Sequence, residues 1–254
     1  MHPVRRRLLK RPPRLPAGSA LAIFVDLDGT LVDIADTPAQ IAVDAALREL
    51  LARLGAACNG ALALVSGRSI ADLDAHLAPL QLPLAGQHGL ERRDPAGHLH
   101  RMPGREQLLP LRQALDALLA RHPEVLVEDK GLSLAVHYRH KPRLAPWLHR
   151  SLRALLAASP GQFALQRGKR VIELRLAGAD KGAAIAAFCA EAPFRGRRPV
   201  FIGDDVTDEH GFAMVNAAQG ISVKVGAGTT AAGHRLPDVA AVLSWLETLV
   251  EDGK

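Results

Sequence analysis

Two short apolar runs that end in acidic residues constrain the fold of this chain more than any other feature. Residues 21–25 form one run, which stops at Asp26 and Asp28, and residues 200–202 form another, which stops at a second pair of aspartates. Continuous apolar runs of this length are typical of strands in a parallel sheet that is covered on both faces. Because such sheets bind ligands at the carboxyl ends of their strands, we expect the acidic residues to meet at one sheet edge.

The order of the predicted elements indicates an α/β protein with a second lobe. Strands and helices alternate near the N-terminus and again after Asp180, as in a doubly wound, Rossmann-like parallel sheet. Between these stretches the order is helix, two strands, helix, two strands, which favours an α+β lobe with an antiparallel sheet. We therefore predict a core of residues 20–103 and 178–254 and an inserted cap of residues 104–177.

The apolar periodicity predicts the individual elements. Those in the core are strands at residues 21–25, 61–65, 200–202 and 221–225 and helices at residues 45–54, 181–190, 208–216 and 239–250. Those in the cap are helices at residues 106–121 and 144–157 and strands at residues 125–128, 132–138, 163–166 and 170–175. A further core helix is expected to follow residues 61–65, with its start at Ser66 and with Ile70, Leu73 and Leu77 on one stripe.

Basic charge is concentrated at the N-terminus. The chain has 32 Lys and Arg against 26 Asp and Glu, and residues 1–14 hold six basic and no acidic side chains, so the remainder is balanced. We predict that residues 1–19, rich in Arg and Pro, form a basic disordered arm. A balanced body with 4% aromatic residues argues against nucleic-acid binding by the folded part. Weak, salt-sensitive contact through the arm stays open.

Composition also indicates the cellular setting. No apolar run approaches the roughly 18 residues that span a bilayer, and no membrane partner is expected. Cys58 and Cys189 lie far apart in apolar segments, which favours two reduced thiols over a disulfide framework. We therefore expect a cytoplasmic protein, and we expect it to be a monomer.

The acidic residues need a cation among them. Asp208 follows the second pair of aspartates by three residues and brings the number of carboxylates to five. Five carboxylates at one sheet edge would repel one another, and an acid-only set of oxygen ligands favours Mg²⁺ over zinc. Each aspartate taken alone is also a common helix N-cap, but two clusters that each follow a buried strand are not explained in this way. The sequence therefore predicts a magnesium site at the sheet edge.

Two further segments carry groups that suit an anion. Ser66 follows a buried strand, and its hydroxyl with the N–H groups of Gly67 and Arg68 would bind a phosphate. Lys181 opens a predicted helix, where its ammonium could contact a phosphate and shield the carboxylates. Taken alone, a lysine in that position is more often a surface residue.

Four short motifs carry a resemblance to a known superfamily. DLDGT, SGR, DKG and GDDVTD, in this order, resemble the motifs of the haloacid dehalogenase (HAD) superfamily of phosphohydrolases. The resemblance implies a HAD-type core with a C2-type cap, and it implies covalent catalysis. Asp26 would be the nucleophile that forms an aspartyl-phosphate, and Asp28 would protonate the leaving sugar oxygen and then activate water.

The same resemblance implies how the metal and the phosphate are held. Mg²⁺ would be bound by Asp26, the backbone carbonyl of Asp28, and Asp204, with Asp205 and Asp208 orienting its ligands. Phosphate oxygens would be held by Thr30, Ser66, Gly67 and Lys181. Lys181 would also stabilise the nucleophile.

Longer stretches narrow the resemblance to one family. FVDLDGTLVDIADTP, GQHG, VEDKGLSLAVHYR, VIELR and GDDVTDEHGF together resemble the trehalose-6-phosphate phosphatases. In that family polar groups of the cap and of one core loop face the sugar, which implies substrate-binding roles for His88, Glu128, Lys130, His137, Arg139 and Glu173. The resemblance thus implies a Mg²⁺-dependent phosphoric monoester hydrolase whose partner is a small sugar phosphate, converted to trehalose and phosphate.

Three other functions would each use part of the same sequence features. Another sugar-phosphate phosphatase, acting on sucrose 6-phosphate or a hexose phosphate, would use the same chemistry and differ only in its cap contacts. A phosphoacceptor signalling module also uses an aspartate, Mg²⁺ and a lysine, but Asp28 and the inserted cap argue against it. A dehydrogenase is disfavoured because the GAGTTA stretch from Gly226 has too little chain after it to complete a dinucleotide-binding domain.

Overall fold

The protein forms two compact units in a computed structural model that describes residues 10–14, 20–34, 41–103, 105–168 and 170–251. One unit, the core, combines the chain up to His100 with the chain from Asp180, and the other unit, the cap, is Arg101–Ala179. The predicted boundaries of core and cap differ from these by two or three residues.

The core contains an eight-stranded sheet in the order β12-β11-β10-β1-β2-β3-β4-β5. Adjacent strands from β12 to β3 are parallel, whereas β3 and β4 are antiparallel. The strands are β1 (Leu21–Val25), β2 (Leu62–Val65), β3 (Leu84–Gly86), β4 (Glu91–Arg93), β5 (Leu99–Arg101), β10 (Arg198–Gly203), β11 (Ile221–Val225) and β12 (His234–Leu236). The doubly wound α/β fold predicted from the sequence is thus confirmed.

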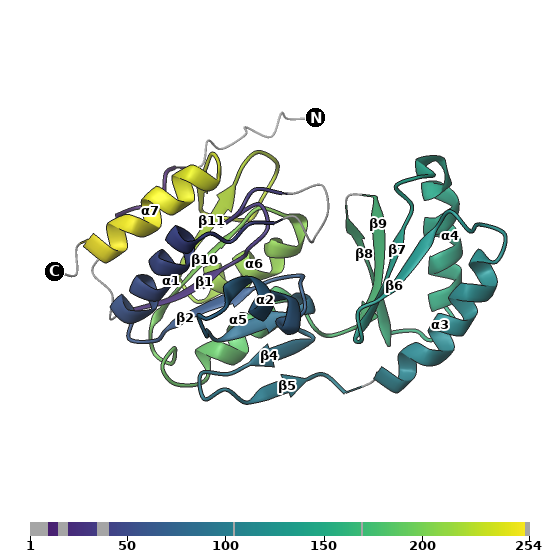
Figure 1. Cartoon of the computed structure of the whole chain (residues 1–254), viewed down its shortest axis with the longest axis horizontal. Helices are drawn as coiled ribbons and strands as arrows, with labels where there is room; N and C mark the ends of the chain where they lie inside the picture. Colours follow the sequence, from purple (N-terminus) through teal and green to yellow (C-terminus); the bar gives the residue numbers. More distant parts are fainter. Residues whose placement is uncertain (1–9, 15–19, 35–40, 104, 169, 252–254) are drawn as a thin grey trace. The chain divides into compact units, whose positions relative to one another are not determined.

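Helices cover the core sheet, and four of them form two contacting pairs (Figure 1). They are α1 (Ala45–Ala57), α2 (Ile70–Leu77), α5 (Lys181–Cys189), α6 (Glu209–Ala217) and α7 (Val239–Glu251), with the short 3₁₀ helices η3 (Gln87–Gly89) and η5 (Val206–Asp208). Helix α1 contacts α7, and α5 contacts α6. Within the described residues, no helix is both long and apolar enough for a membrane span.

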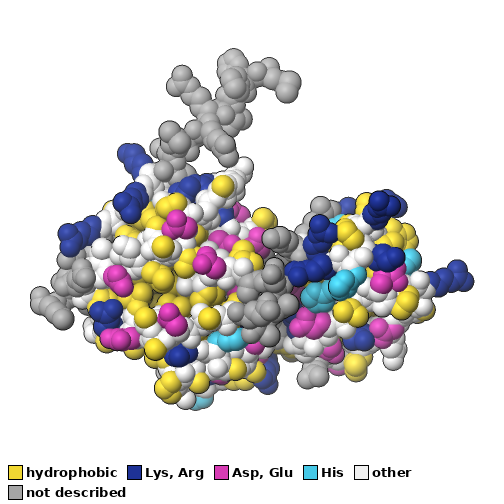
Figure 2. All heavy atoms as spheres, turned by 45° about the horizontal axis from the view of Figure 1, so that its top comes forward, with side chains coloured by type: hydrophobic (Ala, Val, Ile, Leu, Met, Phe, Trp, Pro, Cys, Tyr) yellow, Lys and Arg dark blue, Asp and Glu magenta, His cyan; other side chains and the backbone are white. Residues whose placement is uncertain are grey.

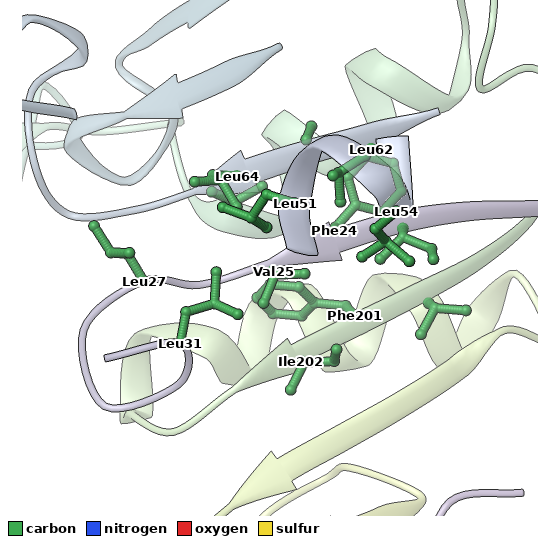
Figure 3. Packing of buried hydrophobic residues seen from close by; sticks show 14 of the residues in the cluster. Phe24, Val25, Leu27, Leu31, Leu51, Leu54, Leu62, Leu64, Phe201 and Ile202 are labelled. Atoms are coloured by element: carbon green, nitrogen blue, oxygen red, sulfur yellow. The ribbon is translucent and has the colours of Figure 1, made fainter. Parts of the chain in front are cut away.

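Aromatic contacts explain which helices cover one sheet face. Phe24 and Phe201 are neighbours across β1 and β10, so their side chains lie on the same face. Phe24 stacks on Phe194 and contacts Phe188 of α5, and Phe201 contacts Phe212 of α6. All five rings are fully buried, which contributes roughly 2 kcal/mol or more each to folding. Figure 3 shows Phe24 and Phe201 from close by, together with aliphatic residues of the same buried cluster.

Helix starts in the core follow the expected capping chemistry, with one correction. Asp44, Ser69 and Asp180 are the N-caps of α1, α2 and α5, and each side chain accepts a hydrogen bond from a backbone N–H of the first turn. The predicted helix with Ile70, Leu73 and Leu77 on one buried stripe is confirmed as α2, but its predicted start at Ser66 is wrong, because the helix begins at Ile70 after the Ser69 cap. Residues 66–68 are therefore a loop between β2 and that cap.

The cap is an α+β unit with its own hydrophobic core. Its antiparallel sheet has the order β6-β7-β9-β8, which confirms the predicted antiparallel pairing. The elements are α3 (Arg105–Leu119), β6 (Leu126–Asp129), β7 (Ser133–His137), η4 (Pro142–Leu144), α4 (Ala145–Leu156), β8 (Phe163–Gly168) and β9 (Val171–Leu176). Leu134, Val136, Ile172 and Leu174 pack with buried leucines of α3 and α4, which both lie on one side of this sheet (Figure 1).

The N-terminal segment differs from its prediction where the structure describes it. Residues 1–9 and 15–19 of the predicted arm lie outside the described residues, but residues 10–14 pack on the core. Lys10 bridges to His234, and its carbonyl accepts the N–H of Arg235 at 3.0 Å. The indole N–H of Trp245 donates to the carbonyl of Pro13 at 3.1 Å. This part of the chain therefore extends the edge of the sheet beside β12.

The charge balance of the body conceals an opposition between its two units. The cap carries fourteen Lys and Arg against six Asp and Glu, and residues 130–172 contain no acidic side chain at all. The core beyond residue 14 carries twelve basic and twenty acidic side chains. Figure 2 shows Lys and Arg in dark blue on the visible face of the cap. The prediction that charges balance in the chain beyond residue 14 is correct for the core and the cap together. The cap alone has an excess of positive charge, which attracts anions.

We predict that removal of residues 10–14 destabilises the core. A chain that begins after Arg14 should be about 1 kcal/mol less stable than a chain that begins at Lys10, because it loses the edge pairing with Arg235 and a hydrogen bond of Trp245. Urea unfolding of the two truncated chains measures the difference. Identical unfolding midpoints would show that this segment does not stabilise the fold.

Candidate active site

The site lies at the carboxyl edge of the core sheet, where β1 and β10 end side by side. Val25 and Ile202 are paired in the parallel register, and the N–H of Asp26 donates to the carbonyl of Ile202 at 3.0 Å. Asp26 follows β1 directly, and Asp204 follows β10 directly. The chain continues from β1 toward β2 on one side and returns to β10 on the other, so this is a switch point of the sheet. The prediction that both acidic groups meet at one edge is confirmed.

A buried lysine joins two buried carboxylates. The Nζ atom of Lys181 lies 2.9 Å from Oδ1 of Asp26 and 2.6 Å from Oδ1 of Asp208. The three residues are 2%, 4% and 0% exposed, respectively. Burial raises the pKa of Asp26 well above its ordinary value, although the charge of Lys181 opposes this effect. Burial alone would lower the pKa of Lys181, but Asp208 and Asp26 more than offset it and keep the ammonium charged.

Asp204 completes a cluster of three carboxylates. One oxygen from each of Asp26, Asp204 and Asp208 lies within 4.8 Å of the others. Burial, followed by the charges of Asp208 and Asp205, raises the pKa of Asp204 to about 6. Gly29, which has a φ of +79°, leaves the room that the Asp204 carboxylate occupies, since a Cβ atom there would overlap it.

This cluster fits a divalent cation with oxygen ligands. Oδ1 of Asp204 is buried and has no hydrogen-bond partner among the described residues. An orphaned buried carboxylate oxygen is costly unless another group, such as a cation, satisfies it. The all-carboxylate donor set is the kind that Mg²⁺ selects.

Asp208 and Asp205 shape the loop that follows β10. Oδ2 of Asp208 accepts the N–H of Asp205 at 2.8 Å, while its other oxygen accepts from Lys181. Gly203 is required beside them, because a Cβ atom at that position would overlap the Asp208 carboxylate. The side chain of Asp205 is exposed at the surface of this loop.

Lys224 is a buried cation that the sequence analysis did not identify as a site residue. It is 5% exposed, and its ammonium donates to the carbonyls of Asp204 and Val225, the latter at 2.9 Å. It therefore holds the backbone of the loop that carries Asp204. The available signal was a lysine inside the otherwise apolar strand of residues 221–225, ISVKV.

Two hydroxyl groups predicted to hold phosphate are buried at this edge. Thr30 and Ser66 are both 0% exposed. Oγ1 of Thr30 has no hydrogen-bond partner among the described residues. Oγ of Ser66 accepts the N–H of Arg68 at 3.2 Å, so its own O–H remains the donor for a ligand. The N–H of Arg68, which was expected to bind an anion, is engaged by this serine instead.

The loop that carries His88 is built on the Ser66 loop. The N–H of His88 donates to the carbonyl of Ser66 at 2.9 Å, and the N–H of Gln87 donates to the carbonyl of Arg68 at 2.8 Å. The imidazole lies over Gly67, where a Cβ atom would come within 2.6 Å of its Cε1 atom. The structure thus places His88 beside the predicted phosphate-binding loop, and Gly67 is the residue that permits this packing.

Asp28 is held by an arginine side chain that the sequence analysis did not assign. The guanidinium of Arg68 donates from Nε and Nη2 to the two oxygens of Asp28, and from Nη1 to Asp72, each at 2.7 Å. Asp28 and Arg68 are 40 residues apart, so no local sequence pattern indicates that they form a pair. The carboxylate of Asp28 is not part of the three-carboxylate cluster.

The predicted sugar-binding residues of the cap lie on its sheet or directly after a strand. Glu128, Ala135 and Glu173 are paired in register across β6, β7 and β9, so the two glutamates share one sheet face. Oε1 of Glu173 is buried and accepts the hydroxyl of Ser133 at 2.5 Å. Glu128 is exposed and lies 2.8 Å from Nε2 of His137.

The other two predicted cap residues follow strands. Lys130 comes directly after β6, and its N–H donates to the carbonyl of Ser133 at 3.0 Å. Arg139 follows β7 by two residues and is exposed. The structure therefore groups Glu128, His137 and Glu173 on one sheet face and places Lys130 and Arg139 at the ends of strands.

Comparison with known proteins agrees with this geometry. A family model described as trehalose-phosphatase matches residues 24–239, which is most of the chain. The chain belongs to the trehalose-phosphatase family. Members of this family are phosphoric monoester hydrolases, and the chain is an enzyme of that class.

Relatives in the trehalose-phosphatase family cover nearly the whole chain. The trehalose-6-phosphate phosphatase of Escherichia coli (strain K12) is 45% identical over 242 residues, which are 95% of this chain and 90% of that protein. The probable trehalose-phosphate phosphatase of Sinorhizobium fredii is 43% identical over 205 residues, which are 81% of this chain and 77% of that protein.

Solved structures of other proteins share the fold of this chain. The C-terminal domain of the C. albicans trehalose-6-phosphate phosphatase has a TM-score of 0.78 at 21% identity, covering 92% of this chain and 93% of that chain. A haloacid dehalogenase-like hydrolase from Bacteroides thetaiotaomicron has a TM-score of 0.67 at 18% identity, covering 90% of this chain and 98% of that chain. At these identities the likeness concerns the fold alone.

We predict that Asp204→Asn stabilises the metal-free protein at pH 7.5, by about 1–2 kcal/mol. The carboxyl has a pKa of about 6 in place of 3.8, so the folded state holds its proton more tightly than the unfolded chain does. The cost of ionising it is absent below about pH 4, grows up to about pH 6 and is constant above that. Urea unfolding in EDTA measures the gain, which should shrink at pH 4.5.

The exposed Asp33→Asn is the matched control, because it removes the same charge without burial. Mg²⁺ should raise the melting temperature of the unmodified protein and of the control more than that of Asp204→Asn. An Asp204→Asn protein with unchanged stability at pH 7.5 would contradict the electrostatic account.

Proposed function

We propose that this chain hydrolyses trehalose 6-phosphate to trehalose and inorganic phosphate, with Mg²⁺ and through an aspartyl-phosphate on Asp26. The observation that carries the proposal is the buried Lys181 between Asp26 and Asp208, with Asp204 within 4.8 Å, at a sheet edge beside two buried hydroxyls. The family match and the 45% identity to a trehalose-6-phosphate phosphatase support the choice of substrate.

In the first half-reaction an oxygen of Asp26 attacks the phosphorus atom. The bond from phosphorus to the sugar oxygen breaks, and that oxygen takes a proton from Asp28, so the sugar leaves as a neutral alcohol. Lys181 offsets the repulsion between the nucleophilic carboxylate and the phosphate dianion. Thr30 and Ser66 are the hydroxyl donors available to the phosphate oxygens.

In the second half-reaction a water molecule attacks the phosphorus atom of the aspartyl-phosphate. Asp28, now a carboxylate, accepts a proton from that water, and the bond between phosphorus and Asp26 breaks. Inorganic phosphate leaves and both aspartates return to their starting protonation states. The net reaction consumes one water for each sugar phosphate.

Asp26, Asp204 and the backbone carbonyl of Asp28 would hold Mg²⁺, with Asp205 and Asp208 supporting the loop around it. When bound, the ion supplies positive charge to the phosphate and to the acidic cluster. Lys224 contributes by fixing the backbone that carries Asp204. The ammonium of Lys181 lies between Asp26 and Asp208 and offsets the negative charge of both. Asp204, whose buried Oδ1 has no hydrogen-bond partner among the described residues, is therefore the carboxylate that most requires a cation.

The cap and the His88 loop would provide the sugar specificity. Glu128, Lys130, His137, Arg139 and Glu173 are the cap residues proposed to contact sugar hydroxyls. Carboxylates accept from hydroxyl groups and cations donate to them, so a face that mixes both suits a disaccharide. Glu173 is already oriented by Ser133, so it is a preformed acceptor rather than a free surface charge.

We predict that Asp26→Asn abolishes phosphate release while the protein remains folded, because an amide cannot form the acyl phosphate. The assay measures phosphate from trehalose 6-phosphate, sucrose 6-phosphate, glucose 6-phosphate and 4-nitrophenyl phosphate, each with Mg²⁺ and with EDTA. The unmodified protein should prefer trehalose 6-phosphate and lose activity in EDTA. The exposed Asp33→Asn is the control and should retain activity.

Two outcomes would overturn parts of this proposal. Substantial turnover by Asp26→Asn would exclude the covalent route. A preference for sucrose 6-phosphate or a hexose phosphate would keep the chemistry and replace the substrate.

We predict that Glu128→Gln and Glu173→Gln reduce kcat/KM for trehalose 6-phosphate by about 10-fold or more, with little change for 4-nitrophenyl phosphate, which has no sugar to recognise. Glutamine keeps the size of each side chain and so limits the loss of packing around the buried Glu173. Glu124→Gln, elsewhere in the cap, is the matched control. Equal losses on both substrates would remove these glutamates from the sugar site.

A further inference from the structure

Arg68 connects the Asp28 carboxylate to helix α2. Two of its N–H groups meet both oxygens of Asp28, and a third meets Oδ2 of Asp72, each at 2.7 Å. The Arg68 side chain is 9% exposed, whereas those of Asp28 and Asp72 are 33% and 42% exposed. A two-point pairing between planar groups fixes the plane of a carboxylate as well as its position. Asp28 is therefore the partner whose orientation the pairing determines.

Arg68 is itself fixed at both ends. Its backbone belongs to the Ser66 loop, through the hydrogen bonds of its N–H with Ser66 and of its carbonyl with Gln87. Its guanidinium is held by Asp72, which lies in the first turn of α2 and donates its own N–H to the Ser69 cap at 3.1 Å. Arg68 thus links the partly exposed carboxylate of Asp28 to the first turn of α2, so the position of that helix determines how the carboxylate is oriented.

We propose that Arg68 is a positioning residue that sets the orientation in which Asp28 exchanges its proton with the sugar oxygen, and that Asp72 holds Arg68 in place. This inference rests on the proposed function. As the phosphorus–oxygen bond breaks, one oxygen of Asp28 delivers its proton to the leaving sugar oxygen, while the other oxygen remains hydrogen-bonded to Arg68. The guanidinium keeps all of its protons throughout.

The leaving group provides a readout that a purely structural role would not change. A sugar alkoxide is a poor leaving group and needs the proton of Asp28 as the bond breaks. A 4-nitrophenolate is stable without that proton, so its release does not depend on the orientation of Asp28. Loss of positioning should therefore slow the first half-reaction with trehalose 6-phosphate far more than with 4-nitrophenyl phosphate.

The experiment compares Arg68→Gln with the unmodified enzyme in single-turnover release of the first product. We expect a loss of about 10- to 100-fold with trehalose 6-phosphate and less than about threefold with 4-nitrophenyl phosphate. Asp72→Asn, which leaves the guanidinium in place, should show the same pattern with a smaller loss, and it serves if Arg68→Gln does not fold. Arg93→Gln is the matched control, because Arg93 also forms a two-point pair with an aspartate, donating from Nη1 and Nη2 to Asp74 of α2 at 2.8 Å for both contacts.

A double-mutant cycle tests whether Arg68 acts through Asp28. In an Asp28→Asn background, Arg68→Gln should cause no more than about a twofold further loss with trehalose 6-phosphate. Equal losses on both substrates, or a full additional loss in that background, would overturn the inference. Failure of the proposed function is visible separately, as an unmodified enzyme that prefers another sugar phosphate. The same comparison of variants is then made with that sugar phosphate and has the same meaning.

Discussion

The ammonium of Lys181, buried between Asp26 and Asp208, is the interaction on which the rest of the site depends. Two unpaired carboxylates at this depth would each need to take up a proton or draw in water, because burial disfavours their charge. Lys181 reaches them because it is the first residue of α5. Gly182, the next residue, lets that helix approach the carbonyl of His210 in α6, where a Cβ atom would come within 2.6 Å. Helix packing therefore sets the position of the charge.

The three clustered carboxylates lie around one ammonium, that of Lys181, so their charges balance only if a bound cation is also counted. Asp204 lies close to two carboxylates that already share Lys181, and burial, followed by the charges of Asp208 and Asp205, raises its pKa. With Asp26 as the proposed nucleophile, a phosphate dianion would lie beside an acidic side chain, so each fixed cation near the site would reduce the repulsion that the substrate meets. The cap, with its excess of basic side chains, has the sign of charge that attracts such a dianion over longer distances.

Much of this architecture could be predicted because it is encoded locally. The apolar runs before Asp26 and Asp204 identified β1 and β10, and parallel pairing then required their ends to meet. Strands β3 and β12 were missed because three residues are too few to establish a period. The helix start was misplaced at Ser66 because the loop and its Ser69 cap offer two similar serines.

The interactions that could not be predicted are individual side-chain and backbone contacts between residues far apart in the sequence, which the order of strands and helices does not determine. The pairing of Arg68 with Asp28 spans 40 residues, and its geometry depends on how β1, β2 and α2 pack. Lys224 lies beside Asp204 only because β10 and β11 are neighbours. The contact of Pro13 with Trp245 spans 232 residues, and it differs from the predicted disorder only for residues 10–14, the part of the arm that the structure describes. Composition indicates which conformations a segment favours in isolation, whereas these contacts depend on how distant segments of the chain fold beside it.

Gly29 illustrates how an active site can be sensitive at a position that carries no chemistry. The space that a β-carbon would occupy there is filled by the Asp204 carboxylate, and the backbone is in the left-handed region. A single added methyl group would compete for space with an oxygen of the proposed metal site. A chain that retained every acidic, basic and hydroxyl group of the site could therefore fail to bind the proposed ion, and a search restricted to charged residues would find nothing missing.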